Sequence, residues 1–129
     1  MESLYLLLPM SVLLVLASLV AHQLGGGRRA QLLASFLAAA TPMAIMQGSS
    51  TQNDLIFAFW LLLATTVSAR IWVDQSLSTR AASVHALAAS LALGMAVATK
   101  GTGLLFGLPI GVLLAAATVR RVGLGRSAL

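Results

Sequence analysis

Long apolar segments alternate with short polar ones along the whole chain. Residues 3–27, 30–53, 55–69, 81–99 and 101–119 contain no formally charged side chain. A transmembrane helix needs about 20 mostly apolar residues, because each residue advances about 1.5 Å across a hydrocarbon core of about 30 Å. Four segments are near that length. The third reaches it when Asp54 and Arg70 lie in the headgroup zones.

This pattern predicts an all-α protein, a polytopic transmembrane helix bundle of about five spans. We expect spans near residues 3–24, 30–47, 54–72, 82–99 and 103–120, within a single transmembrane domain over residues 1–129. Pro9, Pro42 and Pro109 lie inside apolar segments, where each frees a backbone carbonyl. We therefore expect kinks at these positions.

The composition agrees with a membrane protein. Hydrophobic residues make up 59% of the chain and charged residues 9%, against about 45–50% and about 25% in soluble domains. The absence of cysteine excludes disulfides, zinc–thiolate sites and iron–sulfur clusters. The formal charge of +5 does not indicate nucleic-acid binding, because the basic residues occur singly or in pairs between apolar segments rather than in a stripe.

The basic residues also predict an orientation. Positively charged short loops stay in the cytoplasm during insertion. With the amino terminus outside and the carboxyl terminus in the cytoplasm, only Lys100 is translocated, and seven basic residues stay inside: Arg28, Arg29, Arg70, Arg80, Arg120, Arg121 and Arg126. We expect an integral multi-pass protein of the cell (plasma) membrane. No positive residue precedes the first span, so we also expect an earlier helix and a longer parent protein.

Small residues recur at helical spacing in several segments. Gly103, Gly107, Gly111 and Ala115 repeat every four residues, and Gly94 and Ala98 share a face of the preceding segment. Small residues let transmembrane helices approach closely. We expect these faces to form helix–helix contacts in an intimately packed bundle.

Asp54 is the first candidate for chemistry on the outer side. It follows Ser49-Ser-Thr-Gln-Asn53, and Thr51-x-x-Asp54 has the spacing of a capping box. One interpretation is purely structural, with the carboxylate at the positive end of a helix. The other is that Asp54 and neighbouring amides such as Asn53 line an outward-facing pocket for a metal ion or a polar substrate.

Lys100 is the second candidate. Thr99-Lys-Gly101 predicts a helix end, with Gly101 in the left-handed conformation. A cation at a helix carboxyl end is favourable in itself. Alternatively, the ammonium lies beside free amides at the start of the next helix and forms a seat for a lipid phosphate. The sequence contains no catalytic triad, metal-ligand cluster or dinucleotide fingerprint, so we assign no catalytic residue and no cofactor, and leave a metal open.

Two stretches carry a family resemblance, Thr41-Pro-Met-Ala-Ile-Met-Gln-Gly-Ser-Ser-Thr-Gln-Asn-Asp-Leu55 and Gly94-Met-Ala-Val-Ala-Thr-Lys-Gly-Thr-Gly103. Together they resemble the polytopic C-fold glycosyltransferases of the dolichyl-phosphate-mannose protein mannosyltransferase type. The resemblance implies transfer of a sugar from a polyprenyl-phosphate donor to an acceptor hydroxyl on the extracytoplasmic face. It places Asp54, Asn53 and Lys100 at the donor site.

The chain also departs from that family. In that family the catalytic carboxylate lies in the first outer loop, and we expect this sequence to begin after that loop and to end before the family's later helices. We therefore expect a fragment that is inactive alone. The alternative from another class is a small non-enzymatic integral membrane protein, either half of a transporter or a subunit that packs through its glycine face.

Overall fold

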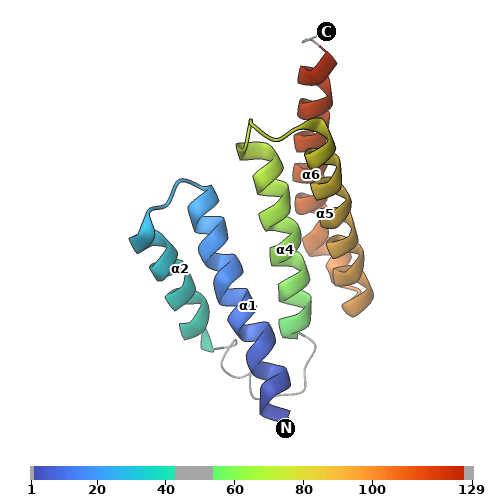
Figure 1. Ribbon diagram of the computed structural model, residues 1–129. Helices are drawn as coiled ribbons and strands as arrows, with labels where there is room; N and C mark the ends of the chain where they lie inside the picture. The colour runs from blue at the N-terminus through green and yellow to red at the C-terminus, as the bar shows by residue number, and fades with distance from the viewer. Residues whose placement is uncertain (1, 43–53, 127–129) are drawn as a thin grey trace.

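The computed structural model describes residues 2–42 and 54–126. Within these residues the protein is all-α, as predicted, with five helices (Figure 1): α1 Glu2–Gln23, α2 Arg28–Ala40, α4 Asp54–Val73, α5 Thr79–Thr99 and α6 Gly103–Arg126. Three segments are long and apolar enough to cross a membrane: Asp54–Val73, Thr79–Thr99 and Gly103–Arg121. These three agree with the third, fourth and fifth predicted spans.

The second predicted span, residues 30–47, is described only in part, because residues 43–47 lie outside the described residues. In the described part, α2 ends at Ala40 and is 13 residues long. Thr41 is extended, with φ −65° and ψ 120°, because the proline ring disfavours the helical region for the preceding residue. The Thr41 hydroxyl donates to the Leu37 carbonyl at 2.9 Å. Pro42 therefore follows a helix end, where we had predicted a kink.

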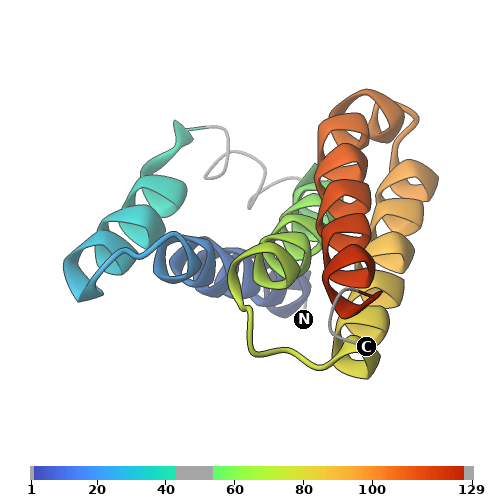
Figure 2. The same cartoon turned by 90° about the horizontal axis from the view of Figure 1, so that it is seen from above.

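The helices run antiparallel to their neighbours along the chain (Figure 1). α4 packs against α1, α5 and α6, and α5 also packs against α6. Among the described helices, α2 packs only against α1, and Figure 2 shows the α1–α2 pair extending to one side of the three long helices. α4 is therefore the central helix, and its two ends lie at opposite ends of the bundle.

The helices meet through small side chains. Most of the buried apolar side chains described in α4, α5 and α6 are those of alanines: Ala64, Ala82, Ala89, Ala92, Ala96 and Ala117. Ser68 is also buried, and Ile71 and Leu114 pack with two of the alanines. Large apolar side chains such as Leu87 and Val119 point outward and are more than 70% exposed. This arrangement suits a lipid environment, in which close packing of small residues holds helices together and large apolar side chains face the lipid.

The described arginines follow the antiparallel arrangement. α2 begins at Arg28, Arg70 and Arg80 flank the α4–α5 turn, and Arg120 and Arg121 lie near the end of α6. These positions are all at the end of the bundle opposite the α5–α6 turn (Figure 1). The fold therefore places Lys100 at one end and the arginines at the other.

Candidate functional site

Asp54 and Lys100 meet at the α5–α6 end of the bundle. The Lys100 ammonium donates to the Asp54 carboxylate at 2.5 Å, although 46 positions separate the two residues. Asp54 is the first residue of α4, and Lys100 directly follows α5. The Lys100 side chain is 47% exposed and the Asp54 side chain 25% exposed. Both charges are therefore accessible at the same end of the bundle.

The backbone conformation at Lys100 ends α5. Lys100 is extended, with φ −153° and ψ 127°, and its N–H donates to the Ala96 carbonyl at 3.0 Å. Gly101 does not adopt the predicted left-handed conformation, since Gly25 is the one described residue with a positive φ. The extended backbone at Lys100 itself ends α5, so the helix needs no left-handed glycine there.

Gly103 allows α6 to begin directly against the last turn of α5. A Cβ atom at this position would lie 2.8 Å from both the Ala96 carbonyl oxygen and the Val97 Cα atom. Real Cβ atoms do not approach backbone atoms this closely. Glycine is therefore required at residue 103, and it keeps the α5–α6 corner tight.

The tight corner occupies the amides at the start of α6. The N–H of Gly103 donates to the Lys100 carbonyl at 2.7 Å, and the N–H of Leu105 donates to the Thr102 carbonyl at 3.0 Å. Leu104 donates to Gly101 at 3.3 Å. The expectation of free amides beside Lys100 is therefore wrong for these residues. An anion at this corner would be bound by the Lys100 side chain rather than by the helix amides.

An aromatic contact aligns the start of α4 with the start of α6. The Phe57 and Phe106 rings pack edge to face with centroids 6.2 Å apart. Phe57 lies one helical turn after Asp54, and Phe106 lies one turn into α6, the helix that follows Lys100. Leu55, beside Asp54, is only 4% exposed and anchors the same end of α4. The only sequence signal for this contact is an aromatic residue one turn into each helix, which does not by itself predict that the two rings meet.

Asn53 and Thr51, which the sequence analysis placed with Asp54, lie outside the described residues. The capping box and the role of Asn53 therefore stay predictions. Within the described part of the chain, no group of three or more His, Cys, Asp or Glu side chains is arranged to hold a metal ion.

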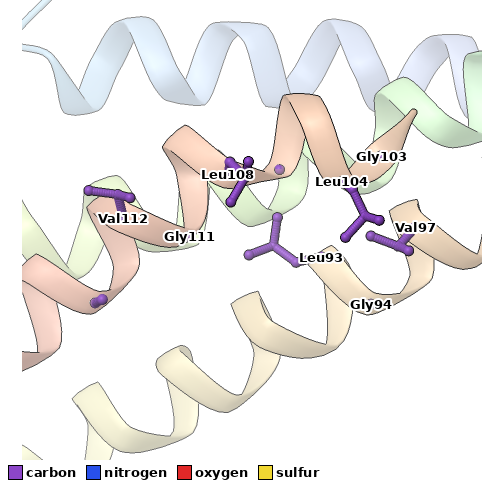
Figure 3. A pocket seen from close by; sticks show the side chains of 10 residues that line it. Leu93, Gly94, Val97, Gly103, Leu104, Leu108, Gly111 and Val112 are labelled. Carbon is purple, nitrogen blue, oxygen red and sulfur yellow. The ribbon is translucent and has the colours of Figure 1, made fainter. Parts of the chain in front are cut away.

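An apolar groove of about 400 Å³ lies between α5 and α6 (Figure 3). Its lining is Leu93, Gly94, Val97, Gly103, Leu104, Gly107, Leu108, Gly111, Val112 and Ala115. A Cβ atom on Gly94 or Gly111 would meet nothing within 4 Å. The predicted glycine face therefore makes a close helix contact at Gly103, whereas Gly94 and Gly111 border the open groove. The wholly apolar lining offers no group that could bind a charged ligand.

The opposite end of the bundle has its own contacts. The Arg121 guanidinium reaches the carboxyl end of α4. Its Nε donates to the Ile71 carbonyl at 3.4 Å, and its Nη1 donates to the carbonyl of Gln75, just after the helix, at 3.0 Å. The Arg120 guanidinium lies 4.9 Å from the centre of the Trp72 ring. Arg121 thus binds one carbonyl in the last turn of α4 and one just after the helix, and Arg120 covers the Trp72 ring, so both arginines fasten α6 to α4.

The fold and these contacts define an integral membrane protein with an exposed acid–base pair at one end of its bundle. The chain belongs to the dolichyl-phosphate-mannose-protein mannosyltransferase family, whose sequence model matches residues 4–128. No curated protein and no solved structure matches the chain. The chain is thus a membrane glycosyltransferase domain of that family, which implies a polyprenyl-phosphate-sugar donor.

Proposed function

We propose that the Asp54–Lys100 end of the bundle binds the phosphate of a polyprenyl-phosphate-sugar donor during transfer of the sugar to an acceptor hydroxyl. The observation that carries this proposal is the position of Lys100. It is a partly exposed ammonium at the end of the bundle from which the described arginines are absent. A lysine ammonium is a compact donor that suits phosphate oxygens.

In the proposed reaction the acceptor oxygen forms a bond to the anomeric carbon. The bond between that carbon and the phosphate oxygen breaks, and the electron pair leaves with the phosphate. Lys100 contributes by stabilising the negative charge on the departing polyprenyl phosphate. The proton of the acceptor hydroxyl passes to a carboxylate. We assign no residue of this chain to that last role.

The proposed topology places the reaction on the extracytoplasmic face. If the described arginines stay in the cytoplasm, the α5–α6 corner and the start of α4 lie on the outer side of the membrane (Figure 1). The donor phosphate would then lie at the headgroup level beside Lys100, with its polyprenyl chain in the lipid. We propose the cell membrane as the location.

Sugar transfer in vesicles tests this function. The polypeptide that carries this chain is supplied with polyprenyl-phosphate-mannose and a hydroxyl-bearing acceptor peptide. We expect Lys100→Ala and Asp54→Asn each to reduce transfer at least tenfold without loss of membrane insertion, and Lys100→Arg to retain more activity than Lys100→Ala. Unchanged transfer in both Lys100→Ala and Asp54→Asn would refute the site.

A further inference from the structure

The Lys100 ammonium already has an ion-pair partner in the structure. Its ammonium contacts the Asp54 carboxylate at 2.5 Å, and the backbone amides at the start of α6 donate to corner carbonyls. The arginines that the structure describes lie at the opposite end of the bundle. A phosphate that arrives at this corner therefore competes with Asp54 for the one described ammonium there.

We propose that Asp54 determines selectivity between the donor and the product of the reaction by competing with phosphate for Lys100. This inference rests on the proposed function. The donor is a phosphodiester, which carries one negative charge. The product is a phosphate monoester, whose charge at neutral pH is about −1.5 to −2. The Asp54 carboxylate repels the more highly charged monoester more strongly, so it favours exchange of spent product for fresh donor.

The exposure of the pair limits the size of the effect. Because Lys100 is 47% exposed and Asp54 25% exposed, water screens the interaction between them. Exposed ion pairs of this kind are weak enough for a ligand to displace. With the carboxylate neutralised, we expect the monoester to bind about three- to tenfold more tightly, with a smaller gain for the diester.

A purely structural ion pair predicts something different. Loss of either charge would then loosen the α4–α5 contact, and binding of both lipids would change by the same factor. The ratio of the two dissociation constants is therefore the informative quantity, because changes in stability cancel in it. Asp74 provides a matched control, since it is an acidic residue beyond the other end of α4.

The experiment measures binding of a short-chain polyprenyl phosphate and of its mannosyl ester to the polypeptide that carries this chain, reconstituted in nanodiscs. We expect Asp54→Asn to increase the preference for polyprenyl phosphate over its mannosyl ester about three- to tenfold. Asp74→Asn should leave the ratio of the two dissociation constants unchanged. Lys100→Gln should weaken the binding of both lipids. Asp54→Ser removes the same charge with a smaller polar side chain, so it serves if the asparagine variant does not fold.

The outcomes separate two failures. In the first case, Lys100→Gln weakens the binding of both lipids, but Asp54→Asn and Asp54→Ser have the same ratio of dissociation constants as the unmodified chain. The selectivity role of Asp54 is then wrong, and the donor site stands. If Lys100→Gln leaves both dissociation constants unchanged, the donor site itself is wrong, and the selectivity role falls with it.

Discussion

The Lys100 ammonium lies 2.5 Å from the Asp54 carboxylate and joins the end of α5 to the beginning of α4. The contact depends on three helix ends that meet at one corner. Gly103 sets the spacing between α5 and α6, and Phe106 contacts Phe57 one turn into α4. The pair is thus held by the packing of three candidate membrane spans.

Gly103→Ala should destabilise the bundle and disturb the pair. The new Cβ would lie 2.8 Å from two backbone positions of α5, and overpacking of this kind typically costs about 1–3 kcal/mol. Gly111→Ala is the matched control, because its Cβ would meet nothing within 4 Å and alanine favours helix by up to about 1 kcal/mol. Thermal unfolding in detergent measures both. Equal stability of the two variants would show that the corner is not tight.

Arg121→Ala should loosen the opposite end of the bundle. The variant loses donors to the Ile71 and Gln75 carbonyls, and hydrogen bonds from a charged donor are worth about 1.5–3 kcal/mol. Arg120→Ala loses only the contact with the Trp72 ring, worth about 0.5–1 kcal/mol at an exposed site. The free energy of unfolding should therefore fall more for Arg121→Ala. The reverse order would contradict the assigned contacts.

Asp74 should give the protein an acid-dependent stability. The Ser76 hydroxyl and amide donate to its carboxylate at 2.6 and 3.0 Å and hold the pKa of Asp74 below its usual range, with Arg70 and Arg121 lowering it further. Because the folded state has the lower pKa, this stabilisation is complete above the usual aspartate range and disappears as the pH falls through the lowered pKa.

Carbon-13 NMR titration of the Asp74 carboxyl measures this shift directly. Ser76→Ala removes the hydroxyl donor and should move the pKa of Asp74 back toward its usual value. Asp74→Asn should remove the corresponding acid-dependent part of the thermal stability. An unchanged titration in Ser76→Ala would assign the shift to another group.

Single cysteines should report the orientation of the bundle. The chain has no native cysteine, so each introduced thiol is unique. We expect an impermeant maleimide to label Thr102→Cys in intact cells and Thr79→Cys only after lysis, because these exposed positions lie at opposite ends of the bundle. The opposite pattern would place Lys100 in the cytoplasm and remove the basis for an extracytoplasmic reaction.

Hydropathy predicts the long helices well because length and apolar character are local properties of the sequence. The predicted spans 54–72 and 103–120 lie close to the observed Asp54–Val73 and Gly103–Arg121. The helix predicted from residue 82 begins at Thr79, since the Ser78 hydroxyl accepts the Ala81 amide at 3.2 Å. Hydropathy alone does not indicate where α2 ends, because the end at Ala40 depends on the local effect of Pro42 on the backbone of Thr41.

The site could be predicted only in part. Successive helices run in opposite directions, so the order of the segments in the sequence is enough to predict that Asp54 and Lys100 lie at the same end of the bundle. Their contact depends on how α4 and α5 pack side by side, which is a tertiary property. The four-residue spacing likewise predicts which glycines share a face of α6, but it does not predict what each glycine packs against. Gly103 contacts α5, whereas Gly111 borders a groove.

Photocrosslinking tests the donor site most directly. A polyprenyl phosphate with a photoreactive group beside its phosphate is bound to the chain in nanodiscs, irradiated, and mapped by mass spectrometry. We predict attachment at Asp54 and within residues 99–103, reduced at least tenfold by Lys100→Gln and unaffected by Arg120→Gln. Attachment instead around Trp72 and Arg120, with no loss in Lys100→Gln, would contradict the account.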